Sequence, residues 1–375
     1  MELTGFDFDT RLAHEFLDCG HQRNARDPHF ILPPHPMIAR QLQPDYPFYA
    51  VPGNAHRHFI ARDKGRAVGR ITAFVNRNLR DGNGESVGTV GFYECIEDDL
   101  LAMRLIDAAV GWLRSRGLRR VWGPMNFDIW HSYRFITRGA DGTPFVSEPR
   151  NAPWYPGQFE RAGFTAVHRW ESLLYRGELR LRALIDFTLP VHEGLTARGF
   201  SFRDIDTRRP EQDFRRLYHL LLPAFRDFPG CTSIAEEDFI ALLRRNRDAL
   251  APGLVSFLTH PDHGEVGFTA TFLDRTRAVQ ALRGELNAAA KLRYLLHRRD
   301  SGRVIYHLAG VLPQHARSAA GCARAMLHRT LQRVLAMGKD EVLIALMRCG
   351  NRVRGLFDAE EADELREYTL YEMRL

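Results

Sequence analysis

Residues 311–323 combine the backbone and side-chain features best suited to binding an anion. The run Val311-Leu312-Pro313-Gln314-His315-Ala316-Arg317-Ser318-Ala319-Ala320-Gly321-Cys322-Ala323 starts as a strand and continues into a helix that opens with small residues. Exposed N–H groups and the dipole at a helix N-terminus favour a phosphate group, and small side chains leave those groups accessible. Arg317 adds a positive charge. The pattern is equally typical of a helix start packed against a sheet, so both interpretations stay open.

Two further side chains are candidates for moving a proton. His307 lies on the strand that enters this run, and an imidazole titrates close to neutral pH, so it suits a general base. The alternative is a hydrogen-bonded core histidine. Alternation along the strand places His307 on one face, and we expect Tyr306 and Leu308 on the other, beneath the helix that begins near Gly321. Glu94 ends a strand in the first half, where it is either a base or an exposed or paired surface carboxylate.

The elements that position these residues occur twice along the chain, in the same order. Each half shows two β-branched or aromatic strands, an amphipathic helix, a stop glycine and a new strand four residues later. In the first half these are 67–74, 87–93, 101–112, Gly117 and 120–123; in the second they are 266–272, 304–311, 323–334, Gly338 and a strand from Val342. A last strand is expected at 368–374. We therefore predict two α/β (α+β) domains, 1–177 and 178–375, each with a mixed, mostly antiparallel sheet flanked by helices.

Composition narrows the class of protein. The 375 residues are 45% hydrophobic and 26% charged, which suits two ordinary cores. The sequence contains no apolar run of 18 residues and no signal-peptide pattern, so we expect a cytoplasmic protein that does not bind membranes. The five cysteines form no C-x-x-C pair, and no metal site is expected. The net charge of +6 comes almost entirely from arginine, which suits phosphate-bearing cofactors or RNA unless it only reflects genomic base composition.

The run 311–323 resembles the acyl-CoA pyrophosphate loop of the GNAT superfamily, whose pattern is V-x-P-x-x-[QR]-x-x-G-x-[GA]. Val311, Pro313 and Gly321 match it, whereas Ala316 and Ala319 replace the usual basic or amide residue and the first glycine. A one-residue insertion would instead place Arg317 at the basic position. Four other segments resemble bacterial proteins with two GNAT domains in tandem, and this similarity runs from about Asp27 to the end; they are 91–95, 112–117, 123–127 and 154–164.

The resemblance implies two tandem GNAT-like domains and an acyl-CoA co-substrate, acetyl-CoA or another, without a metal. The residues that it implies for the cofactor are Val311, Leu312, Arg317, Ser318, Ala319, Ala320, Gly321, Cys322, Ala323 and Asn351. Some members of the superfamily carry a catalytic histidine where His307 stands. The first half has Cys95-Ile96-Glu97-Asp98-Asp99-Leu100 at the matching place, and three carboxylates there suit a helix start but repel a pyrophosphate. The first half is therefore expected to be structural or substrate-binding.

The general acid is not identified by the pattern. The family's tyrosine follows N-x-x-A-x-x-x-Y, but Asp358 stands at that position after Asn351, and Gln158 stands there after Asn151. The general acid is therefore absent, or it is a water molecule, or it is a tyrosine at another position than the family's motif gives. The candidates are Tyr155, which lies about one turn before Gln158, and Tyr294 or Tyr306.

Three functions are compatible with this sequence. The first is a CoA-dependent N-acyltransferase acting on a small amine or an amino-acid-like acceptor. The second is an aminoacyl-tRNA-dependent transferase of tandem GNAT-like architecture, with tRNA as partner, and the third is a non-catalytic binding protein. The segment 130–135 forms either a ligand pocket or a packed loop. The oligomeric state stays open.

Overall fold

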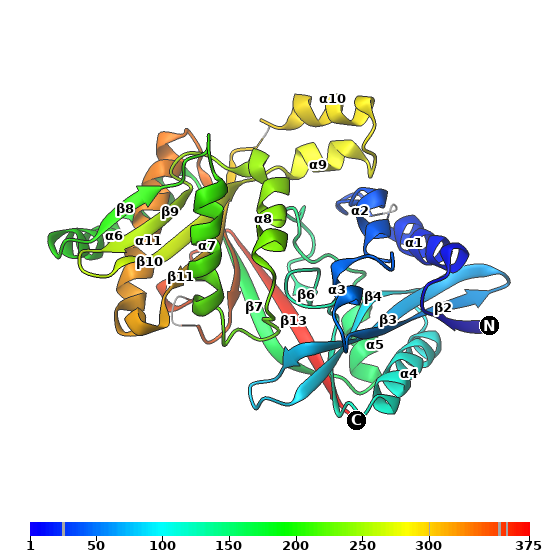
Figure 1. The fold of residues 1–375 in the computed structure, drawn as a ribbon. Coiled ribbons are helices and arrows are strands. Elements are labelled where there is room, and N and C mark those ends of the chain that lie inside the picture. Colours follow the sequence, from blue (N-terminus) through cyan, green and yellow to red (C-terminus); the bar gives the residue numbers. More distant parts are fainter. Residues whose placement is uncertain (25–26, 300, 352–353, 358) are drawn as a thin grey trace.

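The computed structural model describes residues 1–24, 27–299, 301–351, 354–357 and 359–375, with side chains at all of these except 23, 316–320 and 356. Its strands form one sheet in the order β1-β2-β3-β4-β5-β13-β7-β12-β11-β10-β9-β8, and β6 pairs with β13 (Figure 1). The strands are β1 Glu2–Phe6, β2 Ala55–Asp63, β3 Arg66–Arg80, β4 Ser86–Cys95, β5 Arg120–Gly123, β6 Phe135–Arg138, β7 Thr165–Arg176, β8 Ser201–Asp204, β9 Val255–His260, β10 Gly264–Leu273, β11 Arg303–Val311, β12 Glu341–Arg348 and β13 Glu364–Arg374.

In the first half, helices cover both faces of β1 to β5. One face packs against α1 and α3 through a core that includes Phe16, Phe48 and Phe74, and the other packs against α4 and α5. The helix α4 begins at Asp99, the third of the carboxylates expected at its start, and Asp98 is its N-cap, whose side chain accepts from the N–H of Leu101 at 3.0 Å. The helices are α1 Thr10–Asn24, α2 His35–Arg40, α3 Pro47–Ala50, α4 Asp99–Ser115 and α5 Tyr155–Arg161.

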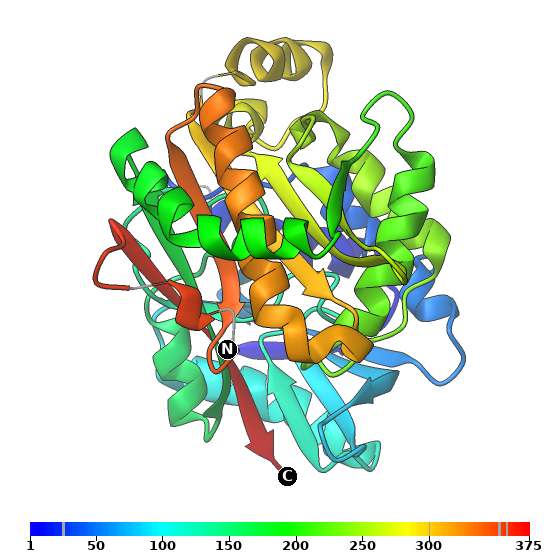
Figure 2. The ribbon, with the colours of Figure 1, turned by 90° about the vertical axis from the view of Figure 1, so that its left-hand side faces the viewer.

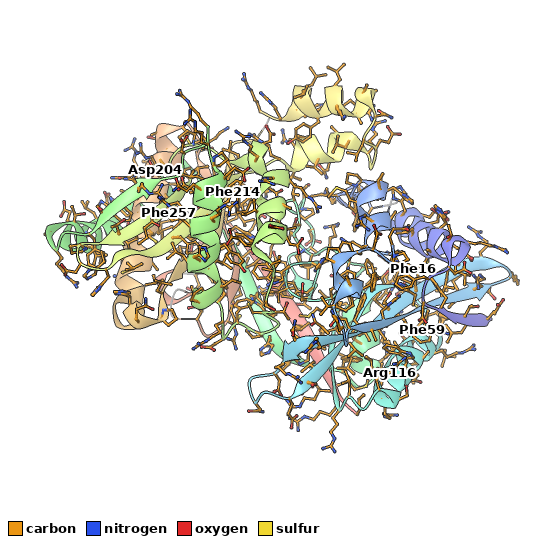
Figure 3. The ribbon with its side chains drawn as sticks, in the orientation of Figure 1. Phe16, Phe59, Arg116, Asp204, Phe214 and Phe257 are labelled. Carbon is orange, nitrogen blue, oxygen red and sulfur yellow. The ribbon has the colours of Figure 1, made fainter. Side chains whose placement is uncertain are left out.

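The second half repeats this plan. The helices α6 and α11 pack together on one face of the sheet (Figure 2), while α7 and α8 cover the other, with Phe214 and Phe257 in their core (Figure 3). A pair formed by α9 and α10 extends away at the top of Figure 1. The helices are α6 Glu178–Ala197, α7 Glu211–Ala224, α8 Glu236–Arg245, α9 Thr276–Leu282, α10 Ala288–His297 and α11 Ala319–Ala336, with 3-10 segments η1 Arg247–Ala249, η2 Pro313–Ser318 and η3 Arg354–Leu356.

The two halves exchange their closing strands. The predicted last strand is confirmed within β13, but β13 inserts between β5 and β7, so it completes the sheet of the first half. Conversely, β7 pairs with β12, with Leu174 opposite Leu343, and so completes the sheet of the second half. Figure 1 shows β7 and β13 running side by side through the centre of the molecule. The predicted boundary falls at Gly177, between the end of β7 and the start of α6.

A β-bulge in β11 sets the direction of its side chains. Ala270 lies opposite Leu308 and Thr271 opposite Tyr306, which leaves His307 as the extra residue. Before the bulge, Tyr306 packs with the buried leucines of α11, as predicted. The prediction that Leu308 also packs beneath that helix is wrong: it lies in the core under α7, because one extra residue moves the following side chains to the opposite face. β4 carries a similar irregularity opposite Arg70 and Thr72.

Candidate functional site

The strands β11 and β12 separate just before the predicted anion loop. Their parallel pairing covers Arg303–Tyr306 and ends there. The N–H of Leu312 donates to the carbonyl of Val266 on β10 at 2.8 Å, so alternation turns the backbone groups of Ala309 and Val311 away from β10, toward the space that β12 leaves. Residues 307–311 are all partly exposed. This edge can therefore pair with a ligand that carries amide groups.

The predicted loop forms a 3-10 turn followed by a long helix. η2 Pro313–Ser318 leads directly into α11, so the backbone has the strand, turn and helix start that the sequence pattern indicates. The side chains of Arg317, Ser318, Ala319 and Ala320 lie outside the described residues. A side chain added at Gly321 would meet Val191 of α6 at 3.7 Å, an ordinary contact. A Cβ atom therefore fits at this position without displacing Val191.

The remaining predicted cofactor residues differ in their exposure. The side chains of Cys322 and Ala323 are buried, that of Cys322 in the core beneath α11, so only their backbone can contact a ligand. Leu312 packs partly against the core under α7. Asn351 is exposed in the turn after β12. Asp358, which stands at the family's tyrosine position, lies outside the described residues.

In the first half, the chain itself bridges the corresponding strands. After two paired residues of β4 and β5, the N–H of Met125 donates to the carbonyl of Val90 at 2.8 Å. The side-chain oxygen of Asn126 then accepts from the N–H of Phe92 at 2.7 Å. The backbone groups that stay open in β11 are thus occupied at this position in β4.

Side chains from the start of α5 occupy the end of the same strand. The indole of Trp154 donates to the carbonyl of Cys95 at 3.1 Å, and the N–H of Cys95 donates to the hydroxyl of Tyr155 at 3.2 Å. The amide of Gln158 donates to the carbonyl of Ile96 at 2.9 Å. The first-half gap is therefore filled by the protein, in addition to the carboxylates at the start of α4.

His307 lies where the two halves meet. Its ring centroid is 6.0 Å from that of Phe145, which belongs to the first half, and 6.2 Å from that of Phe272. Its Nδ1 has no hydrogen-bond partner among the described residues. Burial and the positive charge of Arg134 lower the pKa of His307 to about 4, so the imidazole is neutral at physiological pH. We expected its ordinary pKa to apply, and this expectation is wrong because the strand exchange brings Arg134 and the loop with Phe145 against β11.

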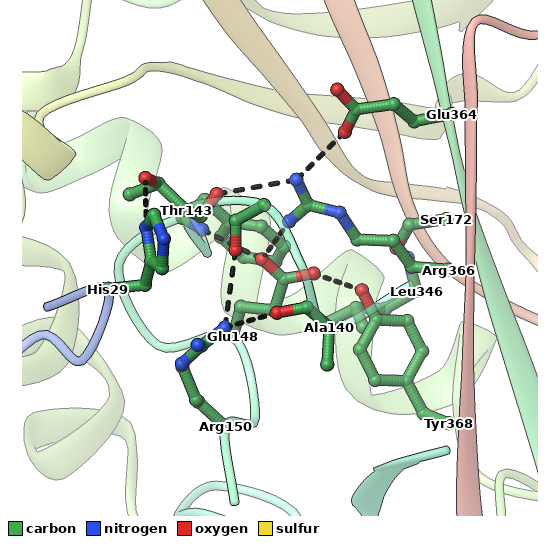
Figure 4. A network of polar contacts seen from close by, with 12 residues as sticks. His29, Ala140, Thr143, Glu148, Arg150, Ser172, Leu346, Glu364, Arg366 and Tyr368 are labelled. Carbon is green, nitrogen blue, oxygen red and sulfur yellow. Dashed lines mark hydrogen bonds and ion pairs between the residues drawn. The ribbon is translucent and has the colours of Figure 1, made fainter. Parts of the chain in front are cut away.

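A buried carboxylate holds the loop that carries Phe145. Glu148 accepts from the N–H of Phe145 at 2.8 Å and from the guanidinium of Arg366 at 2.6 Å, and the hydroxyl of Tyr368 donates to it (Figure 4). Arg366 and Tyr368 belong to β13. Arg150 pairs with Asp27 at 2.5 Å and ties the same loop to the N-terminal segment. The closing strand of the chain thereby positions a first-half loop beside His307.

The other two candidate catalytic residues meet in the first half. The hydroxyl of Tyr155 donates to the carboxylate of Glu94 at 2.6 Å, Asn24 donates to the same carboxylate at 2.8 Å, and Arg70 lies 3.6 Å away. Glu94 is 8% exposed, so it is a paired carboxylate that is buried. The ring contacts of His307 are with Phe145 and Phe272, so the three candidates fall in two separate places.

The sequence did not single out Phe145 or Glu148. Arg134 lies in the aromatic segment 130–135, which was noted only as a pocket or a packed loop. Within the described part of the chain, no helix is long and apolar enough to cross a membrane, and no three His, Cys, Asp or Glu side chains gather as metal ligands would.

Comparison with known proteins gives the fold a name. No family model matches the chain. Protein YghO of Escherichia coli K12 is 23% identical over 332 residues, which are 86% of this chain and 84% of that protein. Among solved structures, a tandem GNAT protein from the clavulanic acid biosynthesis pathway is 13% identical, with a TM-score of 0.53 over 100% of this chain and 98% of that one. A GCN5-related N-acetyltransferase from Anabaena variabilis is 8% identical, with a TM-score of 0.53 over 99% of this chain and 72% of that one. The two halves share one order of helices and strands, and each contains one parallel strand pair. The chain has the fold of the GNAT superfamily, with two GNAT-like domains in tandem.

Proposed function

We propose that the chain is a CoA-dependent N-acyltransferase, which moves an acyl group, acetyl in the first instance, to a small amine or an amino-acid-like acceptor. The observation that carries the proposal is the difference between the halves. β11 and β12 separate ahead of a helix start, whereas Asn126, Trp154 and Tyr155 fill the matching gap of the first half. The domains 1–177 and 178–375 then have different tasks, and only the second holds the cofactor.

The residues of the second half fit the parts of an acyl-CoA. The backbone of Ala309 and Val311 suits the amide groups of a pantetheine arm, and the first N–H groups of α11 suit the pyrophosphate. Arg317 and Ser318 at the end of η2 are assigned to the same phosphates. When bound, acyl-CoA supplies an activated carbonyl, and the chain supplies its position and a proton acceptor.

His307 is proposed as that acceptor. Its pKa of about 4 keeps the ring neutral, and the residue is partly exposed, although its Nδ1 is enclosed and has no partner among the described residues. The low pKa makes it a weak base toward an ammonium ion. Burial and the charge of Arg134 act on an acceptor amine in the same direction, however, and favour its neutral, nucleophilic form. Tyr155 and Glu94 are proposed to support the first half.

Acetyl-CoA binding tests the proposal most directly. At about one hundred times its Kd, a ligand that binds only the native state raises the midpoint of thermal unfolding of a chain of this size by about 3 °C. The variant Gly321→Trp places a bulky group on the first turn of α11 and should abolish this shift, and the thermal transition of the variant without ligand shows whether it folds. The matched control is Glu97→Trp, at an exposed position of the corresponding first-half loop, which should keep the full shift.

The opposite pattern would refute the assignment of the halves. Loss of acetyl-CoA protection in Glu97→Trp, with protection retained in Gly321→Trp, would place the cofactor in the first half. Absence of protection in the unmodified protein, for acetyl-CoA and for longer acyl-CoA esters, would instead support a binding protein that has lost the activity.

A further inference from the structure

The strands β10 and β11 are antiparallel neighbours, but a long insertion joins them. It comprises residues 274–302 and contains α9 and α10. The corresponding strands of the first half, β3 and β4, are joined by residues 81–85 alone. A hairpin needs only a short connection of this kind. The insertion is therefore not required to close the sheet, and its surface is a candidate for binding.

Both halves hold the insertion in place. The carboxylate of Asp248 accepts from the hydroxyl of Tyr294 in α10 at 2.6 Å and lies 3.3 Å from the guanidinium of Arg275. The N–H of His35 in α2 donates to the carbonyl of Gly284, between α9 and α10, at 3.2 Å. α10 packs mainly against α9 and forms the edge of the molecule at the top of Figures 1 and 2. It therefore presents one defined face to its surroundings.

Exposed leucines gather on this face. Leu292, Leu295 and Leu296 of α10 are 59%, 53% and 68% exposed, and Leu286, just before the helix, is 44% exposed. No other stretch of eleven residues in the described chain exposes more than two large hydrophobic residues. Large apolar side chains that cluster on a surface mark an interaction site, whereas single ones are ordinary.

The same insertion is strongly basic. Residues 274–302 contain seven arginines or lysines and three aspartates or glutamates, so they carry +4 of the chain's net charge of +6. A pocket of about 490 Å³ opens between α9 and α10, and its lining is Arg277, Gln280, Ala281, Arg283, Arg293 and His297. Arg293 pairs with Glu285 at 3.1 Å, whereas the side chain of Arg283 makes no ion pair with the described residues. Arginines that line a pocket without an acid suit a phosphate group.

The leucines border this pocket. Leu296 lies three residues after Arg293 and directly before His297, so helical spacing places it beside the pocket wall. An apolar face and a phosphate site are thus combined on one helix.

We propose that the insertion docks on an anionic lipid surface, with the leucines of α10 in the apolar layer and a lipid phosphate in the pocket between α9 and α10. This occupant accounts for both features, because a basic helix with leucines on one face lies in the interface of an anionic bilayer. RNA would use the arginines and leave the leucines in water. A protein partner needs roughly 800 Å² of matching surface on each side, whereas a lipid surface needs no matching shape.

The expectation that the chain does not bind membranes rested on the absence of an 18-residue apolar run. Such a run is needed for a helix that crosses the bilayer, but not for one that lies on its surface. The proposed docking also does not depend on acyl-CoA binding between β11 and β12.

Vesicle binding tests the proposal. The unmodified protein is sedimented with vesicles of phosphatidylcholine alone and with vesicles that contain about one third phosphatidylglycerol, at low and at physiological salt. We expect binding to the anionic vesicles to be at least about tenfold tighter and to weaken as salt rises, because the basic residues are attracted to the charged surface. Equal binding to the two kinds of vesicle, or no binding to either, would overturn the proposal.

Leucine variants locate the apolar contact. Leu292→Ser, Leu295→Ser and Leu296→Ser combined should weaken binding to the anionic vesicles at least about tenfold, whereas Leu100→Ser, at an exposed leucine of α4, should leave it unchanged. The triple variant should keep its thermal transition and its acetyl-CoA protection, so failure here is distinguishable from failure of the proposed function. Unchanged vesicle binding in the triple variant would contradict the docking.

An arginine variant tests the phosphate pocket. Arg283→Gln should weaken binding to the anionic vesicles about fivefold at low salt, and Arg226→Gln, at an exposed arginine outside the insertion, should weaken it less than about twofold. Equal effects of the two variants would remove the pocket from the proposal.

Two other occupants would give different results. Binding of an RNA oligonucleotide that survives the three serine substitutions, without vesicle binding, would assign the insertion to RNA. Self-association in analytical ultracentrifugation that the serine substitutions abolish, without vesicle binding, would assign the leucine face to a second copy of the chain. Either result overturns the proposal.

Discussion

Replacing His307 by glutamine should change how the stability of the protein depends on pH. The pKa of this imidazole is about 4 in the folded chain, against an ordinary value of 6.5, mainly because of burial and then because of Arg134. As pH falls below 6.5, the unfolded chain takes up a proton at this residue and the folded chain does not. Stability is therefore lost between pH 6.5 and 4, and the loss ends once both forms are protonated.

The difference in pKa sets the size of the effect. At about 1.4 kcal/mol per pKa unit, His307 contributes at most about 3 kcal/mol to this loss, and less to the extent that its partly exposed ring contacts water. Urea unfolding at pH 7 and near pH 4 should show that the unmodified protein loses up to that much more stability than His307→Gln. Other buried histidines whose pKa is lowered, such as His58, contribute equally to the stability loss of both proteins, so their contributions cancel in the difference. His219→Gln, at a mostly exposed histidine, is the control.

If the unmodified protein and His307→Gln lost equal stability between pH 7 and pH 4, the ring of His307 would be solvated and its packing between Phe145 and Phe272 would be refuted. Activity supplies an independent check once a substrate is known. His307→Gln should lower turnover by about 10²- to 10⁴-fold with little change in acetyl-CoA affinity. In the unmodified enzyme, the acid limb of the rate should lie near pH 4. A limb near the ordinary imidazole pKa that survives in the variant would exclude this histidine as the base.

Three further outcomes are expected. Glu148→Gln should lower the free energy of unfolding by roughly 1–3 kcal/mol, because Arg366 and Tyr368 lose a buried charged acceptor while Glu364 still pairs with Arg366 at 3.0 Å; an unchanged stability in urea unfolding would contradict this. Tyr155→Phe should cost roughly 1–3 kcal/mol through loss of the hydrogen bond to Glu94, while acetyl-CoA protection stays unchanged; loss of that protection would move the cofactor to the first half. Fragments 1–177 and 178–375 should each fail to fold alone and should form a soluble complex when expressed together, since each sheet uses a strand of the other; a cooperative thermal transition in either fragment alone would argue against this.

Local sequence patterns were enough to predict many of the helices and strands. The expected strands at 67–74 and 87–93 lie within β3 and β4, and the helix expected over 101–112 lies within α4. Gly117 and Gly338 both follow their helices with positive φ, which glycine adopts at little cost, so these stops could be placed from the sequence. The same holds for the strand, turn and helix start around 311–321.

The arrangement of the candidate site could not be obtained in this way. No local pattern indicates that β13 pairs with β5 or that β7 pairs with β12, because strand partners are chosen by the packing of whole faces and by long-range register. That exchange brings Phe145 and Arg134 beside His307 and lowers its pKa. The bulge at His307 likewise arises from the pairing with β10. It places Leu308 in the core under α7, whereas simple alternation predicted the face covered by α11.

By itself, the sequence determined what depends on neighbours along the chain: the repeated order of elements, the stop glycines, the acidic start of α4 and the small residues that open α11. Only the tertiary structure decided which half has an open strand edge, which residues surround the candidate base, and which charged groups are buried. These properties depend on residues such as Trp154, Glu148 and Arg134, whose effect comes from contacts across the sheet, and burial and pairing of this kind have no signature in local residue spacing.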